Sequence, residues 1–240
     1  MQVSLTIIRY PKRFVPIALL AMAFHRLPLW LNKNISFYKL MGSGRNGTFD
    51  KHPDWQQWAI FMVRKNAIDI TELNESLYYK KLFGNLIAGW FKFFKCETWT
   101  VFLEPVVSHG SWDGSNPFGK IQAHQNLEGT IAVLTRATIH YNKLKAFWAN
   151  VPQVQIQMQH AEGLIVSFGI GEVPFIKQAT FSVWSSESAM KAFAYDMQQH
   201  KDVIKKTRDE GWYREEMFSR FLVLGTRGSI NGIDPLAEIG

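Results

Sequence analysis

Strand-like and helix-like stretches alternate in a regular order through the first hundred residues. Residues 3–10 are rich in β-branched and aromatic side chains and predict a strand, as do residues 35–41, 55–63 and 99–107. Residues 14–31 form an apolar stretch that predicts a helix, and a second helical stretch is predicted from about residue 70 to 94. The predicted order, strand–helix–strand–strand–helix–strand, is that of a ferredoxin-like unit.

The second half of the chain repeats this order. Strands are predicted at residues 131–139, 164–170, 179–184 and 218–224, and helices at residues 142–150 and 188–208. Two short words also recur, and Trp99 and Phe221, which lie at equal distances after the two Gly-Trp words, both fall in predicted strands. The corresponding words are Gly42-Ser43-Gly44 with Gly169-Ile170-Gly171, and Gly89-Trp90-Phe91 with Gly211-Trp212-Tyr213. Such correspondence indicates two similar structural units.

The repeat predicts the architecture, because one sheet cannot cover its own apolar face. Two such sheets are expected to close into a β-barrel flanked by helices. The predicted fold class is therefore α+β, with two ferredoxin-like (βαββαβ) repeats forming a dimeric α+β barrel within one chain. The first repeat covers residues 1–107 and the second covers residues 130–227. Residues 108–129, rich in Gly, Ser and Asn, are predicted to be a linker, and residues 228–240 a C-terminal tail.

Composition and charge narrow the classes of partner. Hydrophobic residues make up 47% of the 240-residue chain and charged residues 20%, which is typical of a globular protein. The net charge of +7 favours an anionic partner such as a membrane surface, an acidic redox protein or a nucleic acid. We expect no nucleic-acid partner, because the sequence has no long Lys/Arg run and no zinc-ligand spacing.

The cysteine count and the N-terminal region bear on the compartment. The single cysteine, Cys96, excludes an intrachain disulfide and fits a reducing compartment. The longest apolar run, residues 14–24, is interrupted by Pro16 and is predicted to be too short to span a bilayer. No small-residue cleavage site follows it, so a signal peptide is not expected. We therefore expect a cytoplasmic protein.

Common catalytic motifs are missing from the sequence. The segment Gly169-Ile-Gly-Glu-Val-Pro174 lacks the third glycine of a dinucleotide loop and leads into a strand instead of a helix. The sequence contains no nucleophile elbow, no His-Glu-x-x-His metal motif and no Walker loop. These absences leave room for a protein whose chemistry is supplied by a cofactor.

An ordered series of short words runs through residues 134–221. It comprises Leu134-Thr-Arg-Ala-Thr-Ile139, Phe147-Trp148, Val151-Pro152, Gly169-Ile-Gly-Glu-Val-Pro174, Gln178-Ala-Thr-Phe-Ser-Val-Trp184, His200 and Gly211-Trp-Tyr-Arg-Glu-Glu-Met-Phe-Ser-Arg-Phe221. In this order and spacing the words resemble the spheroidene monooxygenase family. The resemblance implies haem b as cofactor and insertion of oxygen at the end of an acyclic carotenoid. Two hydroxylations would give a geminal diol that dehydrates to a ketone.

The resemblance marks His200 as the axial ligand of the haem iron. On the predicted helix 188–208, helical spacing aligns His200 with Phe193, Met197 and Ile204, so its imidazole would share the apolar, sheet-facing stripe. Coordination to iron would satisfy one ring nitrogen there. The alternative is a partly exposed histidine bonded to solvent or backbone.

Arg136 is a candidate for both catalysis and cofactor binding. It lies in the middle of a predicted strand, on the same face as Leu134 and Thr138. If that face is the barrel interior, the guanidinium needs an anionic partner. A haem propionate or bound oxygen would serve, and so would Glu172 or Glu216. Arg208 and Arg220 are secondary candidates for propionate contact.

The strand 178–184 offers a second candidate surface. Alternation places Gln178, Thr180, Ser182 and Trp184 on one face, and Phe181 and Val183 on the other. The polar row could line a distal pocket with Gln178 as a catalytic residue, or it could be the solvent face of a half-buried strand. Phe181 and Trp184 are the aromatic candidates for contact with the macrocycle.

The leading hypothesis is a haem-dependent monooxygenase that acts on an apolar, carotenoid-like polyene with O2. Electrons would come from an external donor such as a ferredoxin, since the chain has no flavin or iron–sulfur motif. One alternative is a haem lyase, dehydratase or peroxidase on the same barrel, which would need the same histidine but no reductant. The other is a non-catalytic carrier of haem or pigment.

The apolar helix at residues 14–31 is also a candidate for membrane contact. Arg9, Lys12, Arg13 and Arg26 flank it or lie within it, and a basic amphipathic surface binds anionic headgroups. The alternative is that the helix only covers the sheet of the first repeat. We expect salt-sensitive, peripheral attachment without a spanning segment.

Overall fold

The computed structural model describes residues 1–69, 74–121, 128–196, 207 and 209–237. In the first repeat, the helices and 3-10 helices connect strands in the predicted order. The strands are β1 (Gln2–Arg9), β2 (Ile35–Gly44), β3 (Pro53–Arg64) and β4 (Glu97–Gly110). The connecting elements are η1 (Lys12–Phe14), α1 (Val15–Phe24), α2 (Arg26–Leu31), η2 (Arg45–Gly47), α3 (Glu75–Phe83) and α4 (Asn85–Phe93).

The second repeat follows the same plan. Its strands are β5 (Ile131–Ile139), β6 (Leu164–Val173), β7 (Lys177–Trp184) and β8 (Tyr213–Gly228). Between them lie η3 (Tyr141–Lys143), α5 (Leu144–Gln159) and α6 (Glu187–Asp196). Both repeats therefore begin with a strand, a 3-10 helix and an α-helix at matching spacing.

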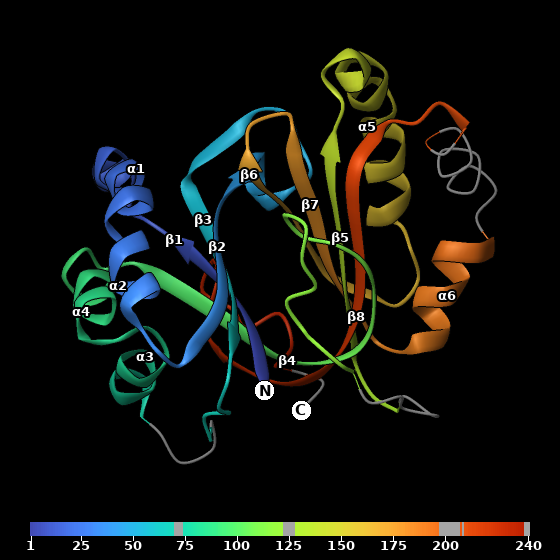
Figure 1. The fold of residues 1–240 in the computed structure, drawn as a ribbon. Helices are drawn as coiled ribbons and strands as arrows, with labels where there is room; N and C mark the ends of the chain where they lie inside the picture. The colour runs from blue at the N-terminus through green and yellow to red at the C-terminus, as the bar shows by residue number, and fades with distance from the viewer. Residues whose placement is uncertain (70–73, 122–127, 197–206, 208, 238–240) are drawn as a thin grey trace.

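The strands close into one barrel in the order β1-β3-β2-β6-β7-β5-β8-β4, with β4 pairing back to β1. Two antiparallel seams join the repeats: β2 with β6, and β4 with β8. At the first seam the corresponding glycine words meet, with Gly42 opposite Gly171. Helices α1 to α4 lie on one side of the barrel and α5 and α6 on the other (Figure 1). The closed barrel confirms the predicted fold class.

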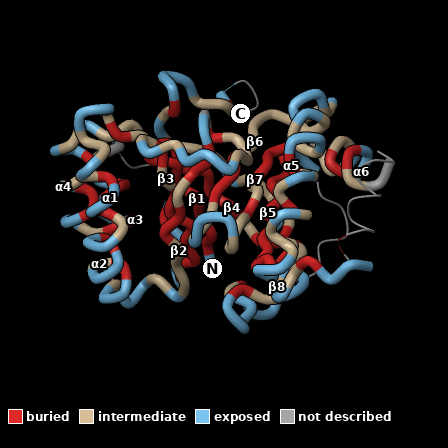
Figure 2. Tube along the Cα trace, turned by 90° about the horizontal axis from the view of Figure 1, so that it is seen from above, coloured by how far each residue is buried: buried red, intermediate tan, exposed pale blue. Residues whose placement is uncertain are grey.

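The barrel interior is filled by apolar side chains from both repeats. Figure 2 shows buried strands in the middle of the molecule and exposed helical surfaces outside them. Each large apolar side chain that is fully buried in this interior contributes roughly 1.5–3 kcal/mol to the stability of the fold. Interior residues from the strands include Val3, Leu5, Ile7, Phe61, Ala132, Leu134, Phe181 and Phe221.

The connection between the repeats and the C-terminal tail both belong to this core. Residues 108–110 are the end of β4, and Trp112 and Phe118, which follow, are buried among the interior side chains. In the tail, Ile230 and Leu236 enter the same cluster, and Trp99 Nε1 donates to Asp234 at 2.8 Å. The predicted linker and tail therefore fill the barrel as well as joining and ending the repeats.

Two helical predictions need correction. The stretch predicted from residue 70 to 94 is two helices, because Gly84, with φ +89°, separates α3 from α4. The helix predicted to stop near residue 150 continues to Gln159 despite Pro152, since Phe147 and Val151 pack into a buried cluster that holds it on the sheet. Of the helix predicted at residues 188–208, α6 is described up to Asp196, and residues 197–206 and 208 lie outside the described residues.

The predicted helix at residues 14–31 is divided at His25 into α1 and α2. The stretch Lys12–Leu31 would be able to cross a membrane by length and composition. Only 22% of its most apolar window is buried in the structure. The expected shortness concerned residues 14–24 alone, and the longer stretch Lys12–Leu31 that includes them reaches the length of a span. In the structure, Ala18, Ala21 and Leu29 of this stretch pack on the first repeat.

Glycine is required where β4 ends. Gly110 has φ +84°, and a Cβ there would overlap the Glu216 carbonyl of β8. Gly110→Ala is therefore expected to lower the free energy of unfolding by roughly 2–4 kcal/mol, measured by urea denaturation. Gly114→Ala is the control: its φ of +78° gives similar strain, but nothing in the described structure lies within 4 Å of the added Cβ. Equal destabilisation by the two substitutions would refute the packing argument.

Candidate functional site

Strand β5 lies between β7 and β8, and its two faces have different surroundings. Leu134 belongs to the barrel interior, whereas Val133 packs in a cluster with α6 on the outer side of the sheet. Because side chains alternate along a strand, Arg136 shares the interior face with Leu134, and Thr135 shares the outer face with Val133. The predicted site residues of this repeat are therefore divided between two sites.

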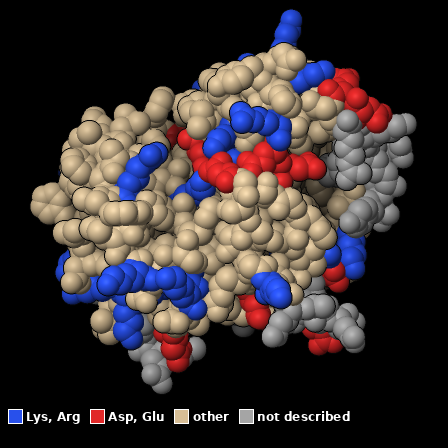
Figure 3. Space-filling view, in the orientation of Figure 1, with Lys and Arg blue, Asp and Glu red and all other residues tan. Residues whose placement is uncertain are grey.

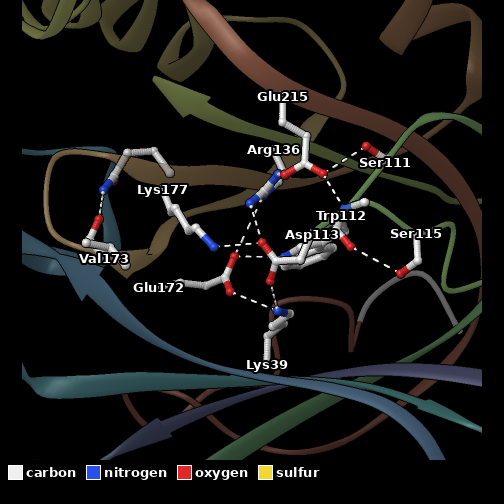
Figure 4. Close-up of polar contacts among 12 residues, drawn as sticks. Lys39, Ser111, Trp112, Asp113, Ser115, Arg136, Glu172, Val173, Lys177 and Glu215 are labelled. Carbon is white, nitrogen blue, oxygen red and sulfur yellow. Dashed lines mark hydrogen bonds and ion pairs between the residues drawn. The ribbon is translucent and has the colours of Figure 1, made fainter. Parts of the chain in front are cut away.

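On the interior face, Arg136 is only 1% exposed and is held by carboxylates. Its Nη1 donates to Glu215, its Nη2 lies 3.3 Å from Asp113 Oδ1, and its Nε lies 3.7 Å from Glu172 Oε1 (Figure 4). The prediction that this guanidinium needs an anionic partner is confirmed, with Glu172 among the predicted candidates. The other partners are Glu215 and Asp113 instead of Glu216.

Two lysines complete this charged group at the barrel mouth. Lys177 Nζ lies 2.6 Å from Asp113, and Lys39 Nζ contacts Asp113 and lies 3.2 Å from Glu172. Lys39 comes from β2, so the group ties the two repeats together. Figure 3 shows the mixed red and blue surface that results. We name it the mouth cluster: Lys39, Asp113, Arg136, Glu172, Lys177 and Glu215.

Two carboxylates of the mouth cluster, Asp113 and Glu215, are stabilised in their charged form. Burial alone would raise the pKa of Asp113, but hydrogen bonds from Lys177 and Lys39 outweigh it and lower that pKa to about 2. Burial likewise opposes the shift at Glu215, whose pKa falls to about 2 because the Gly114 N–H, Arg136 and Ser111 donate to it. Cations and anions are equal in number here, and each lies within ion-pair distance of at least one partner, while Arg136 Nε has no hydrogen-bond partner among the described residues.

On the outer face, the two repeats differ at one equivalent position. Thr6 in β1 and Thr135 in β5 each lie six residues before the first residue of a 3-10 helix. Thr6 is fully buried under the helices of the first repeat, with its Oγ1 2.7 Å from Thr100 Oγ1. Thr135 is exposed, although it lies on the middle strand of β7-β5-β8. Among the described residues, the helix layer of the second repeat therefore leaves its sheet uncovered at the centre.

This uncovered surface runs across the sheet. Thr135 is opposite Thr180 of β7 and Phe218 of β8, and both of these are partly exposed. We name these three residues the outer strip. On one side lies an apolar cluster with α6 that contains Ile131, Val133, Trp184, Met190 and Phe193. On the other lies the cluster with α5 that contains Ile139, Phe147, Val151 and Trp212.

Arg220 is a basic residue at the border of the outer strip. It is opposite Val133 in the β5–β8 register, and therefore on the outer face, two residues after Phe218. Its Nη1 donates to Glu187 at 2.6 Å. Its Nε is buried and has no hydrogen-bond partner within the described part of the chain. An unmade hydrogen bond of this kind costs on the order of 1–3 kcal/mol.

The structure brings together only part of the predicted haem-contact set. Trp184 and Phe193 meet with ring centroids 5.2 Å apart, and Trp184 Nε1 donates to Ser182 at 2.9 Å. Phe181 lies in the barrel interior, on the opposite side of β7, and so does not share a surface with them. Gln178 is partly exposed on the outer face, with its Nε2 bonded to the Val173 carbonyl at 3.1 Å.

The predicted axial ligand falls in an undescribed segment. His200, Met197 and Ile204 lie outside the described residues, as does Arg208. Among the residues that the structure describes, no group of three or more His, Cys, Asp and Glu side chains could hold a metal ion. His200 therefore stays a prediction.

The buried histidine of the described residues lies in the other repeat. His25 is 5% exposed, burial lowers its pKa to about 4, and its Nε2 has no hydrogen-bond partner in the described part. Its ring lies edge-on to Trp90 and Phe91, beside a small cavity beneath α1. Helices cover the sheet here, so His25 does not face an open surface like the outer strip.

Sequence reasoning missed Trp112 and Asp113. Both fall in the predicted linker, because Gly, Ser and Asn surround them. Trp112 Nε1 in fact donates to Glu172 at 2.7 Å, and Arg136 lies 5.7 Å from the Trp112 ring centroid. A large aromatic residue next to an acidic one in an otherwise small and polar segment was the signal that could have found them.

Two ferredoxin-like repeats closed into a single barrel define a dimeric α+β barrel protein. Comparison with solved structures agrees: an aldoxime dehydratase in complex with butyraldoxime has a TM-score of 0.59 at 11% identity, covering 92% of this chain and 79% of that one. A second aldoxime dehydratase has a TM-score of 0.57 at 9% identity, covering 92% and 80%. At these identities the likeness shows the fold alone.

No family model matches the chain, but curated relatives do. The spheroidene monooxygenase of Rhodobacter capsulatus is 36% identical over 93% of this chain and 90% of its own length. That of Cereibacter sphaeroides is 34% identical over 90% of this chain but 63% of its own length, and that of Rubrivivax gelatinosus is 31% identical over 82% and 72%. The chain therefore belongs to the spheroidene monooxygenase family, and it is an enzyme of the monooxygenase class.

The mouth cluster predicts acid-sensitive stability. Because the pKa of Glu215 is lower in the folded than in the unfolded chain, its contribution is present above about pH 4.5 and is lost as the pH falls towards 2. Glu215→Gln is expected to cost roughly 3 kcal/mol at pH 7, since it leaves Arg136 buried with one partner fewer. It should also flatten the decline of stability between pH 4.5 and 2.

Urea denaturation across this pH range measures both effects. The matched control is Glu216→Gln, the exposed neighbour on the same strand, which should change stability by less than about 0.5 kcal/mol. If the two variants lost the same amount of stability, the mouth cluster would not be the source.

Proposed function

We propose that this enzyme is a haem-dependent monooxygenase that inserts oxygen into an apolar, carotenoid-like polyene, using O2 and electrons from an external donor. The names of the relatives, spheroidene monooxygenases, support the carotenoid class of substrate. The observation that carries the cofactor proposal is the exposed Thr135 at the centre of a sheet whose counterpart in the first repeat is fully covered.

The described residues fit haem at two of its three requirements. Haem needs an apolar surface for the macrocycle, cations for its propionates and an axial ligand. Phe218 of the outer strip offers an apolar side chain, and Arg220, at the border of the strip, offers a cation. His200, which follows α6 in the sequence, would be the axial ligand that the family resemblance implies. Trp184 and Phe193, both buried in the cluster with α6, would support that side of the strip from beneath.

When bound, haem would supply the reductive activation of O2. The residues of this chain would supply the surroundings. The hydroxyls of Thr135 and Thr180 can donate and accept hydrogen bonds to a polar atom above the strip. The apolar clusters on both sides would keep water from that surface. Gln178, two residues before Thr180 on the same face, would lie at its edge.

Arg136 has a different part in this proposal from the one predicted. It lies on the interior side of β5, and its guanidinium is occupied by three carboxylates. Its role is therefore to hold β5, β8 and the segment after β4 together, and Arg220 takes over as the candidate for a propionate. This exchange follows from strand alternation, which puts Arg136 and Arg220 on opposite faces of the sheet.

The reaction class sets requirements for partners and location. A monooxygenase without flavin or iron–sulfur motifs needs an external donor, for which we propose a ferredoxin-like protein. A carotenoid-like substrate is dissolved in lipid, so we propose a cytoplasmic enzyme with peripheral membrane contact. Membership of the family favours the monooxygenase over the lyase, dehydratase, peroxidase and carrier alternatives.

A bulky side chain on the outer strip should block the cofactor. Thr135→Trp is expected to weaken haem binding at least tenfold, and His200→Ala should abolish the Soret band of the ligated haem, both measured by absorbance titration with haemin. Leu224→Trp, at an exposed position further along β8, is the control and should bind like the wild type. Identical titration curves for Thr135→Trp and Leu224→Trp would exclude the outer strip as the haem site.

The need for an electron donor separates the reaction classes. Haem-loaded protein given O2 and an acyclic carotenoid in detergent is expected to form oxygenated product only when a ferredoxin and its reductase are supplied. Product is measured by chromatography and by incorporation of labelled oxygen from O2. Turnover of equal rate without reductant would favour the lyase or dehydratase instead.

A further inference from the structure

Helices α1 and α2 expose most of their large apolar side chains. Ala18, Ala21 and Leu29 pack on the sheet, and these are mostly small side chains. The large side chains of the same helices face outward, with Trp30 being 72% exposed. An apolar patch of this kind on a folded protein marks an interaction surface. The outward residues are Leu19, Leu20, Phe24, Leu27, Trp30 and Leu31.

Helix α4 extends this patch. Leu86 and Phe93 are 77% and 76% exposed, and their spacing of seven residues puts them on the same face of the helix. The α1 and α4 helices are neighbours, since the ring centroids of Phe24 and Trp90 are 6.0 Å apart and those of Phe14 and Phe94 are 5.2 Å apart. We name the joint surface of α1, α2 and α4 the basic apolar face.

The charges around this face are of one sign. Residues 1–49 contain seven Lys and Arg and no Asp or Glu, and residues 76–96 contain four Lys and again no acid. These two segments supply α1, α2, α4 and most of α3. Figure 3 shows blue on tan over the side of the molecule that carries α2. The exposed cations on or next to the three helices are Lys12, Arg13, Arg26, Lys33, Lys92 and Lys95.

We propose that the basic apolar face docks the protein on an anionic lipid bilayer, with the large side chains in the interfacial region and the cations on the headgroups. Apolar burial and attraction to anionic lipid act together on such a surface. The inference rests on the proposed function only in giving the docking a purpose, access to a lipid-dissolved substrate.

The observations favour a bilayer over a second copy of this chain. A symmetric dimer through this face would bring the cations of both copies together without any acid to pair with them. They also favour docking over spanning. Withdrawing α1 and α2 into a membrane would uncover Ile8, Ile60 and Met62, which they and their neighbours now bury. It would also draw Arg26, which lies within the stretch, towards the hydrocarbon.

The docking surface and the outer strip are separate. Figure 1 places α1, α2 and α4 on one side of the barrel and α5 and α6 on the other. The face therefore holds the protein at the bilayer without itself forming the proposed haem site. Variants of the face are expected to leave haem binding unchanged, which makes the two proposals testable independently.

Vesicle flotation tests the docking. Wild-type protein is expected to float with vesicles of phosphatidylcholine and phosphatidylglycerol at low salt, and much less with phosphatidylcholine alone or at high salt. Two double variants should each weaken binding to the anionic vesicles at least tenfold: Leu27→Ser with Trp30→Ser, and Arg26→Glu with Lys92→Glu. All four positions are exposed, so the variants should keep the melting temperature of the wild type.

The controls carry substitutions of the same kind on other surfaces. Ile156→Ser, at a 58% exposed position of α5, and Lys120→Glu with Lys145→Glu, both exposed, should float like the wild type. Equal loss in face and control variants would mean that net charge alone attracts the vesicles, and would overturn the proposal. So would equal recovery with neutral and anionic vesicles at low salt.

Three further outcomes decide between occupants and between proposals. A wild-type dimer in light scattering that Leu27→Ser with Trp30→Ser converts to a monomer would overturn docking in favour of a second copy. Protein that stays in membranes of the expressing cells after alkaline carbonate washing would overturn it in favour of spanning. Vesicle binding without haem binding would support docking and refute the proposed function. Haem binding without vesicle binding would support the proposed function and refute docking.

Discussion

The closure of the barrel is the constraint on which the other features depend. A ferredoxin-like sheet has one face that its own helices cover and one face that they cannot reach. In this chain the two uncovered faces become one interior, and the seams β2–β6 and β4–β8 leave every strand with two neighbours. Closure also fixes which side chains face inward, because a strand with partners on both sides cannot shift its register by one residue without reversing its faces.

Filling that interior requires more than the strands. Trp112 and Phe118 from the connection between the repeats, and Ile230 and Leu236 from the tail, enter the same core. The mouth cluster follows from this packing, because Asp113 comes next to Trp112 and reaches Arg136, Lys39 and Lys177 at once. The cluster therefore joins both repeats and the segment between them, and its buried charges are tolerable because each one has a partner.

Outside the barrel, the two repeats have diverged in what their helices cover. In the first repeat, Thr6 is sealed beneath the helices, and those helices turn large apolar side chains outward among basic residues. In the second repeat, the sheet is open at Thr135, between the clusters beneath α5 and α6. A duplicated fold thus offers two different outer surfaces on opposite sides of one barrel. Family membership assigns a monooxygenase reaction to the whole molecule. The difference between the two outer surfaces suggests that the second repeat binds the cofactor and the first repeat contacts the membrane.

The sequence by itself determined the repeated order of strands and helices, the closed barrel and the family. These follow from local periodicity, from words that recur in both halves and from an ordered resemblance over residues 134–221. All three can be read in the sequence alone. It also determined, through alternation, that Arg136 and Leu134 share a face. Only the tertiary structure decided that this face is the interior, that Glu215 and Asp113 meet Arg136 there, and that Thr135 is open where Thr6 is closed. The reason is physical: periodicity fixes the direction of a side chain relative to its own strand, whereas partners and exposure depend on segments distant in sequence.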